Sequence, residues 1–239
     1  IINSSKVISD RLKFSAGLEE IIYHSNLQKK TKERSQLHKL ISANTWIFGD
    51  AFSLTVNDQS LTEVLKKHLK LLGKSVTIDD GVTTLDKKKG IIDIMLSKAV
   101  PQNHEGELEH LIIELKAPKV KVNKENISQI ESYAFAVSDD ERFKNLKTKW
   151  NFWIISTDLD DFAKMKRNQQ GFEKGVIYKS DLSLESNLTI WVKTWSEIFS
   201  ECKHRLQFIK EHLNLNITLD QGFQFLKKTY PEYTKDLNK

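Results

Sequence analysis

The chain has 239 residues, which is enough to bury a full hydrophobic core and to form one or two domains. Hydrophobic residues make up 39% of the sequence and charged residues 29%, a balance that excludes a disordered or fibrous chain. The formal net charge of +5 suits a polyanionic ligand without requiring one. The single cysteine, Cys202, excludes an internal disulfide framework and favours a reducing, cytoplasmic location.

The beginning of the chain carries no targeting signal. No apolar stretch approaches the ~20 residues that a membrane-spanning helix needs, so no membrane partner is expected. Because the first residue is Ile1 rather than Met, we expect a further domain upstream in a longer chain. Residues 1–32 are interpreted as a connection from that missing part.

Two helices are predicted in the next sixty residues. Helical spacing of apolar residues predicts the first over residues 29–43, with Glu33 near its start, where a carboxylate also interacts favourably with the helix dipole. Ser60 and Glu63 form a capping box for the second, which ends at Gly73. The box gives Glu63 a structural role, so it ranks below Glu33 as a site residue. His68, on the apolar face, is expected to pack rather than to react.

Charged residues interrupt two apolar runs in the middle of the chain. A short strand is expected before them, at 74–78. The runs 91–96 and 111–115 predict adjacent strands joined by a loop, and Asp93 lies within the first. Glu114 lies in the second and Lys116 directly follows it; because alternate side chains of a strand share a face, these two point the same way. Charges are rarely buried unless they are paired or bind metal. Two carboxylates beside a lysine therefore suggest a divalent-cation site.

The remaining sequence alternates helices and strands. A helix is predicted over 123–137, with Gln129 and Tyr133 on one face because they are four residues apart. Further strands are expected at 150–156, 175–179 and 188–192, and another helix near 159–165. Capping boxes that begin at Thr194 and Thr218 predict two C-terminal helices. There is no HExxH motif, Cys/His cluster, P-loop or GxSxG motif. A zinc site, nucleotide binding through a P-loop and a GxSxG-type serine nucleophile are therefore not expected.

The spacing of Asp93, twenty further residues and Glu114-x-Lys116 resembles the PD-(D/E)XK nuclease superfamily. Over roughly residues 33 to 180 the amino-acid sequence is similar to the nuclease domain of the Shedu anti-phage defence family. Six segments carry this resemblance: NTWIFGDAF (44–52), SLTEVLKKHLKLLG (60–73), GIIDIML (90–96), EHLIIELKAP (109–118), ISQIESYAFAV (127–137) and KWNFWIIS (149–156).

The resemblance implies an α/β, restriction-endonuclease-like core with a mixed central sheet flanked by helices. It implies a metal-dependent DNA endonuclease in anti-phage immunity. The nuclease domain would span 33–193, and a helical extension over 194–239 would pack on the core or on a second subunit. A homo-oligomer is expected, because cutting both strands of DNA requires two active sites, which a twofold dimer supplies.

The expected site follows from these residues together with the resemblance. Asp93, Glu114 and the backbone carbonyl of Leu115 would hold one or two Mg²⁺ ions, with Mn²⁺ as a substitute. Lys116 would position or deprotonate the attacking water and stabilise the phosphate in the transition state. The resemblance adds Gln129 to orient the site and Glu33 to complete it. Phosphate contacts are expected from two basic clusters, although solvated surface charge explains them equally well: Lys87, Lys88 and Lys89; Lys119, Lys121 and Lys124.

Two alternatives stay open because a fold does not guarantee an activity. The chain could be a non-catalytic DNA-binding or assembly module on a nuclease-like scaffold, or an oligomerisation domain that serves an upstream enzyme. The intact set of Asp93, Glu114 and Lys116 favours the enzyme.

Overall fold

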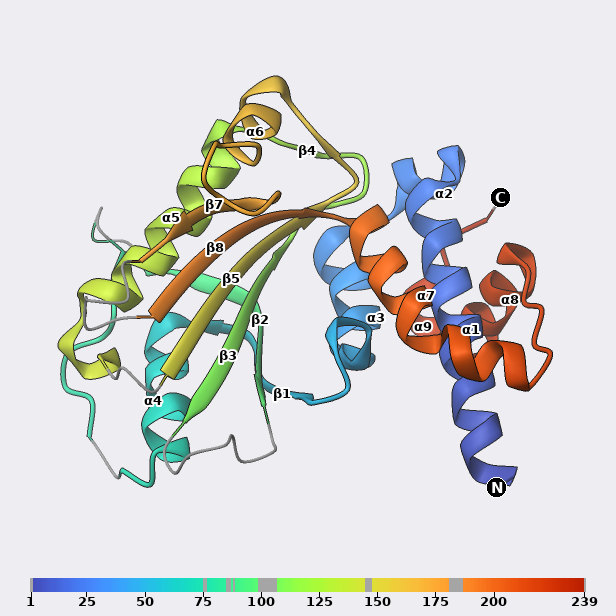
Figure 1. The fold of residues 1–239 in the computed structure, drawn as a ribbon, viewed down its shortest axis with the longest axis horizontal. Coiled ribbons are helices and arrows are strands. Elements are labelled where there is room, and N and C mark those ends of the chain that lie inside the picture. The colour runs from blue at the N-terminus through green and yellow to red at the C-terminus, as the bar shows by residue number, and fades with distance from the viewer. Residues whose placement is uncertain are drawn as a thin grey trace.

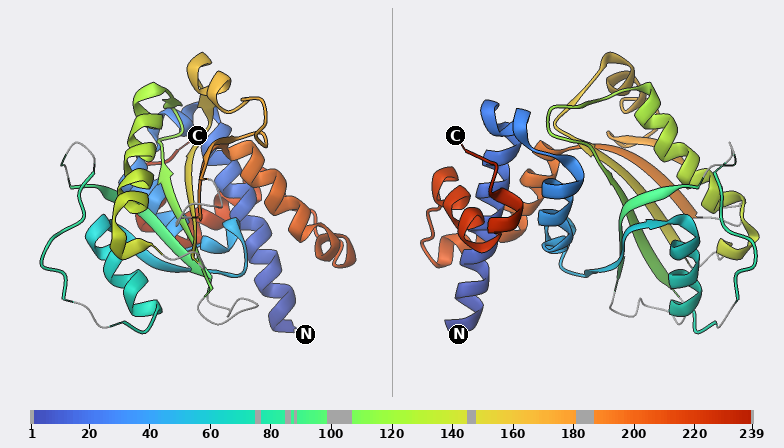
Figure 2. Two further views of the ribbon diagram at one scale, coloured as in Figure 1. Left: turned by 60° about the vertical axis from the view of Figure 1, so that its left-hand side comes forward. Right: turned by 180° about the vertical axis from the view of Figure 1, so that it is seen from behind.

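The computed structural model describes residues 2–74, 77–84, 87, 89–98, 107–144, 148–180 and 187–238, with side chains described from residue 5 onward. These residues form a twisted six-stranded sheet with a layer of helices on each face (Figures 1 and 2). From one edge of the sheet to the other the strands are β1 (Phe52–Ser60), β2 (Ile91–Lys98), β3 (Leu108–Leu115), β5 (Thr148–Ser156), β8 (Asn187–Thr194) and β7 (Val176–Lys179).

The sheet is mixed. Strands β1, β2 and β3 pair antiparallel, β3, β5 and β8 run parallel, and β7 returns antiparallel to β8. A second, two-stranded parallel sheet of β4 (Lys121–Val122) and β6 (Asp158–Leu159) follows the carboxyl ends of β3 and β5. The predicted α/β class, with a mixed sheet flanked by helices, is confirmed.

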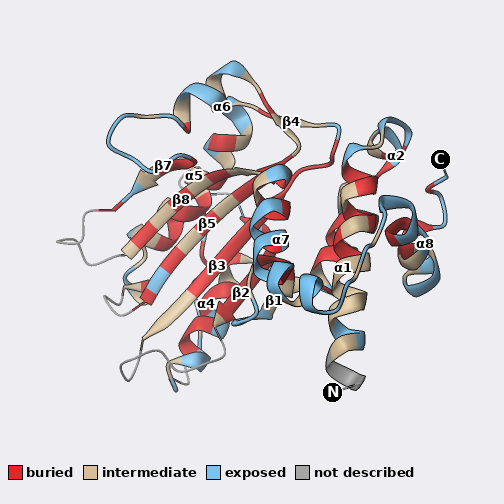
Figure 3. Ribbon diagram, turned by 45° about the vertical axis from the view of Figure 1, so that its right-hand side comes forward, coloured by how far each residue is buried: buried red, intermediate tan, exposed pale blue. Residues whose placement is uncertain are grey.

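Strands β2 and β3 are buried along most of their length on both faces, which explains why they read as continuous apolar runs (Figure 3). Ile112 of β3 and Ile190 of β8 contribute to one core, which α4 (Leu61–Leu71) and α5 (Lys124–Asp139) cover. Ile113 of β3 contributes to the other, beneath the terminal helices. The alternation of side chains along each strand therefore supplies both cores.

The N-terminal segment is a long helix. The expected connecting segment 1–32 contains α1 (Ile2–Tyr23), whose Phe14 and Leu18 are buried, and its connection to an upstream part stays a prediction. This helix crosses α8 (Leu219–Thr229) at Gly17, and a Cβ added to Gly222 would lie 2.3 Å from the Gly17 backbone nitrogen. Only glycines permit this close approach. The helix is hard to predict from sequence because its polar residues interrupt the apolar spacing.

The helix predicted over 29–43 is broken into three pieces. Helix α2 (Ser25–Lys30) ends before an extended Thr31, a single π-helical turn η1 spans Glu33–Leu37, and α3 (His38–Ser42) completes the segment. The prediction of one continuous helix is therefore wrong. The buried Gln36 side chain accepts a hydrogen bond from the Lys32 backbone at 2.8 Å, which stabilises the chain where the regular helical bonds are interrupted.

Edge strand β1 was not predicted. Val56 is its one buried side chain, so the strand lacks an apolar run, as is common for a strand at a sheet edge. The strand expected at 74–78 does not form at Lys74, Thr77 or Ile78, and its other two residues lie outside the described part of the chain, as do Lys88 and the loop 99–106. The remaining short helices are η2 (Thr45–Phe48), η3 (Glu141–Phe143), α6 (Asp161–Lys166) and α9 (Pro231–Thr234).

The predicted C-terminal helices are confirmed. Helices α7 (Trp195–His212) and α8 (Leu219–Thr229) begin at reciprocal capping boxes, with Thr194 and Thr218 as the N-caps. They pack on α1 within the same chain, and three of their large apolar side chains are buried: Trp195, Phe199 and Phe223. Phe208 is exposed. Self-association through these helices stays a prediction, which light scattering would test. Among the helices of the described ranges, none combines the length and the apolar composition that a membrane span requires.

Two histidines form a buried pair between α4 and β3. His68 Nδ1 lies 3.1 Å from His110 Nε2, and His110 Nδ1 lies 2.8 Å from Ser97 Oγ. The Trp150 ring packs against both imidazoles. Burial lowers the pKa of His68 to about 4 and that of His110 to about 3, so both rings are neutral in the native state. His68 thus packs in the core, as the sequence predicted.

The pair should weaken the native state in mild acid. In the unfolded chain both imidazoles bind a proton near their ordinary pKa, whereas the folded state resists protonation until the pH falls to about 4. Lowering the pH from 7 to 5 should therefore cost about 2 kcal/mol for each histidine. Urea unfolding of the wild type and of His68→Leu at both pH values tests this expectation. Between pH 7 and pH 5 the variant should lose about 2 kcal/mol less stability than the wild type. Equal losses in the two proteins would contradict this expectation.

Candidate active site

Asp93 and Glu114 lie on neighbouring antiparallel strands, near the start of β2 and the end of β3. The Leu115 backbone N–H donates to Asp93 Oδ2 at 2.8 Å, so the carboxylate of one strand is held by the backbone of the next. Each of the two acidic residues is only 5% exposed. The register of two apolar strands thus places two buried acids at one end of the sheet.

Lys116 links this acidic pair to helix α5. Its Nζ donates to Glu114 Oε1 at 2.8 Å and to Gln129 Oε1 at 3.0 Å, and the residue is 8% exposed. The Gln129 amide also donates to Glu114 Oε1 at 2.9 Å and to the Tyr133 hydroxyl at 2.8 Å. Asn123 caps the helix that carries Gln129. The side chains of Glu114, Lys116 and Gln129 therefore form one closed set of hydrogen bonds.

Glu33 reaches the same region from the π-turn. Its Oε2 accepts a hydrogen bond of 2.6 Å from the Ala117 backbone N–H, just beyond Lys116. Glu63 instead pairs with Lys66 on α4 at 2.5 Å. Of the two acids considered as the further member of the site, Glu33 is the one that contacts the chain next to Lys116.

Burial and mutual repulsion dominate the electrostatics of the two strand acids. Burial, followed by the Asp93 charge, raises the pKa of Glu114 to about 7, and the Lys116 ammonium opposes this rise. Burial likewise raises the pKa of Asp93, opposed by the Leu115 N–H and the nearby His38 imidazole. Two buried carboxyl groups with raised pKa values are costly to ionise without a counter-charge. A bound cation would compensate both charges, so the pair favours cation binding.

The donor set fits Mg²⁺ better than a softer metal. The candidate ligands are carboxylate oxygens, which Mg²⁺ prefers, and the ion usually keeps several waters. Across the ranges that the structure describes, no three His, Cys, Asp or Glu side chains gather into a group that could hold a metal. The two carboxylates, Asp93 and Glu114, therefore fit an oxygen-preferring ion that keeps part of its water shell.

The lysines that are expected to contact phosphates flank the site residues in the chain, and their surroundings differ. Lys87 and Lys89 are exposed just before β2, and Lys119 is exposed just after β3. Lys121 pairs with Asp158 at 2.7 Å, and the Lys124 ammonium lies 6.0 Å from the centre of the Phe162 ring. Lys88 falls outside the described residues.

The structure adds two residues to the expected surroundings of the site. Tyr133 holds the Gln129 amide, and its position four residues after Gln129 was the sequence signal for the contact. His38 is 1% exposed and close enough to Asp93 to influence its charge. No pattern in the sequence indicated His38, because a regular helix would turn it away from Glu33.

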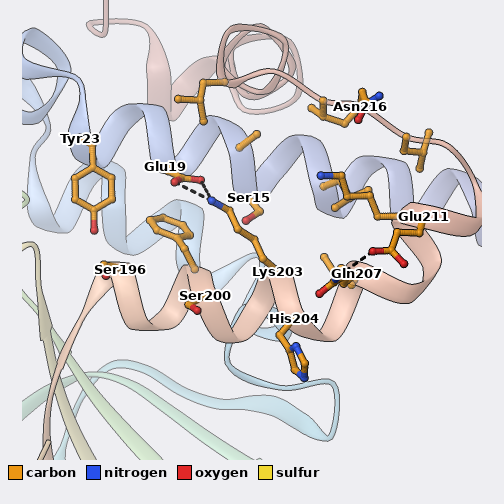
Figure 4. A pocket seen from close by; sticks show the side chains of 18 of the residues that line it. Ser15, Glu19, Tyr23, Ser196, Ser200, Lys203, His204, Gln207, Glu211 and Asn216 are labelled. Carbon is orange, nitrogen blue, oxygen red and sulfur yellow. Dashed lines mark hydrogen bonds and ion pairs between the residues drawn. The ribbon is translucent and has the colours of Figure 1, made fainter. Parts of the chain in front are cut away.

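A groove of about 1060 Å³ lies elsewhere, between α1, α7 and the segment that leads to α8 (Figure 4). Lys203 of α7 donates to Glu19 of α1 across it at 2.9 Å, and Gln207 donates to Glu211 along α7 at 2.9 Å. The lining of this groove includes none of the residues at the ends of β2 and β3 that form the candidate site: Asp93, Glu114 and Lys116. The groove is therefore separate from the candidate active site.

One family model matches part of the chain. Residues 57–141 match the model described as type I restriction enzyme R protein N terminus (HSDR_N). The matched stretch contains Asp93, Glu114, Lys116 and Gln129, whereas Glu33 lies outside it. No curated protein and no solved structure matches the chain. This stretch points to restriction-nuclease-related proteins, and the resemblance to Shedu stays a prediction.

Proposed function

We propose that this protein is a Mg²⁺-dependent DNA endonuclease of the PD-(D/E)XK type that acts in anti-phage immunity. One observation carries the proposal: Glu114, Lys116 and Gln129 bond to one another beside Asp93, all within the stretch similar to a restriction-enzyme subunit. The role in immunity rests on the resemblance to Shedu nucleases.

In this proposal the residues of the site divide the work of phosphodiester hydrolysis. Asp93, Glu114 and the Leu115 backbone carbonyl would hold Mg²⁺, for which Mn²⁺ could substitute. A bound Mg²⁺ supplies charge neutralisation at the scissile phosphate and lowers the pKa of a bound water. Glu33 completes the acidic side of the site.

Lys116 is arranged to act as a cation. Its ammonium donates to Glu114 and Gln129, two acceptors that hold it at the strand end. This arrangement favours stabilisation of negative charge on the phosphate over proton abstraction by Lys116. Gln129 fixes both Lys116 and Glu114, and Tyr133 fixes the amide orientation of Gln129 in turn.

Cleavage of supercoiled plasmid tests the proposal. The protein should nick or linearise plasmid with Mg²⁺ or Mn²⁺ and should lose this activity with EDTA. DNA retention on a gel in Ca²⁺ serves as the parallel binding assay. Retention without cleavage in Mg²⁺ would favour the non-catalytic DNA-binding module. The absence of both would favour an oligomerisation domain and would rule out the nuclease.

The exposed lysines around the site should contact DNA phosphates without reading sequence. Replacing Lys119 and Lys124 with alanine should weaken DNA binding uniformly across sequences and reduce the slope of log K against log salt by about 1 for each phosphate that the variant no longer neutralises. Fluorescence anisotropy in Ca²⁺ at several salt concentrations measures both quantities. Lys228→Ala, on the exposed side of α8, is the matched control and should leave both unchanged. An unchanged slope in the double variant would remove these lysines from the DNA surface.

A further inference from the structure

A π-helical turn precedes the candidate site. The Leu37 N–H donates to the Lys32 carbonyl at 3.1 Å, and the His38 N–H donates to the Glu33 carbonyl, so both bonds span five residues. Such turns are rare, and single π-turns occur frequently at functional sites. This turn separates α2 from α3.

The turn changes which side chains share a face. In a regular α-helix Glu33 and His38 would lie about 140° apart around the axis. In the π-turn each N–H bonds the carbonyl five residues earlier, so His38 lies one turn above Glu33. The additional residue in the turn therefore aligns two side chains that a regular helix would separate.

Both aligned side chains lie against the strand-end site, which consists of Asp93, Glu114 and Lys116. Glu33 Oε2 accepts the hydrogen bond from the Ala117 N–H, and both Glu33 and His38 interact electrostatically with the Asp93 carboxylate. His38 is 1% exposed, and among the residues that the structure describes its Nε2 atom has no hydrogen-bond partner. A buried ring nitrogen without a partner is costly, so packing alone would favour an apolar residue at this position.

We propose that the π-turn Glu33–Leu37 orients Glu33 and His38 toward Asp93, and that His38 is a positioning residue that holds the Asp93 carboxylate in the orientation the site requires. Nε2, which has no hydrogen-bond partner among the described residues, would reach the carboxylate through one water molecule. The proposal rests on the proposed nuclease function for its effect on cleavage, but its effect on metal binding does not require DNA.

Two substitutions of His38 separate positioning from packing. His38→Leu fills similar space without a polar atom, whereas His38→Gln retains an amide near the place of Nε2. If His38 positions Asp93, the leucine variant should melt at the wild-type temperature or above, yet bind Mn²⁺ about tenfold more weakly. The kcat for plasmid cleavage should fall by a similar factor of about ten, with KM unchanged, and glutamine should restore part of both losses.

Titration calorimetry with Mn²⁺ alone and plasmid cleavage are the two readouts. If His38→Leu retains wild-type Mn²⁺ affinity and kcat, His38 is a packing residue and the proposal fails. If the wild type binds Mn²⁺ in a His38-dependent manner but cuts no DNA, the proposed function fails and this inference stands.

Inserting one alanine after Ser35 tests the turn itself. Ser35 is exposed, and the insertion places Glu33 and His38 six residues apart, which corresponds to about 120° around a regular helix axis. A folded insertion variant should show the weakened Mn²⁺ binding of the double variant Glu33→Gln/His38→Leu, whereas Ser35→Ala should bind Mn²⁺ normally. Wild-type Mn²⁺ affinity in a folded insertion variant would refute the positioning role of the turn. If the insertion variant does not fold, the two His38 substitutions decide the proposal.

Discussion

Asp93→Asn is expected to abolish cleavage and, in the absence of metal, to raise the melting temperature. Asparagine retains an oxygen that accepts the Leu115 N–H but removes a buried charge that repels Glu114. Burial raises the pKa of Asp93, so its ionised form destabilises the native state at pH 7, and the neutral asparagine should raise Tm. Calorimetric melting in EDTA and plasmid cleavage in Mg²⁺ measure the two effects.

Matched variants extend this test to the rest of the site. Lys116→Met retains the length of the side chain and removes the ammonium, and it should reduce kcat about 10²–10³-fold. Glu114→Gln should likewise eliminate Mg²⁺-dependent cleavage. Added Mg²⁺ should raise the Tm of the wild type but not that of Asp93→Asn. A folded Asp93→Asn or Glu114→Gln protein that still nicks plasmid at the wild-type rate would disprove the assignment.

Gly222→Val should severely destabilise the helical layer of the terminal segments. A Cβ at residue 222 would lie 2.3 Å from the Gly17 nitrogen and 2.7 Å from the Ala16 Cβ, and neither backbone can move without separating α1 from α8. Valine adds two methyl groups at this contact, so a loss of at least about 3 kcal/mol is expected.

Urea unfolding measures that loss, with Gln224→Ala as the control. Gln224 is exposed on the same helix, so its substitution should change the free energy of unfolding by no more than about 0.5 kcal/mol. A Gly222→Val protein as stable as the control would show that α1 and α8 do not pack as described.

The centre of the fold and of the candidate site could be read from the sequence, because a local pattern specifies each part. Strands β2 and β3 are continuous apolar runs, and the charges of Asp93, Glu114 and Lys116 stand out against them. The capping boxes at Thr194 and Thr218 mark the starts of α7 and α8 directly. In each case the signal lies within a few residues of the feature that it predicts.

Features that depend on tertiary contacts could not be read in this way. Strand β1 owes its place to pairing with β2 and has one buried side chain, so its sequence lacks a strand pattern. The π-turn depends on a single additional residue, which periodicity averaged over 29–43 does not detect. Helix α1 is recognised by its contact with α8, since Gly17 is unremarkable until Gly222 lies opposite it.

That contact between α1 and α8 has a consequence for synthesis on the ribosome. Gly222 follows Gly17 by about two hundred residues, so α1 emerges long before the helix that covers it. At ~5–20 residues per second, the apolar face of α1 waits on the order of ten seconds or more for its partner. The core over α4 and α5, by contrast, is complete once β8 has emerged. The nascent chain should therefore acquire the strand-end site first and close its helical layer last, with α1 the segment most exposed to chaperones in the interval.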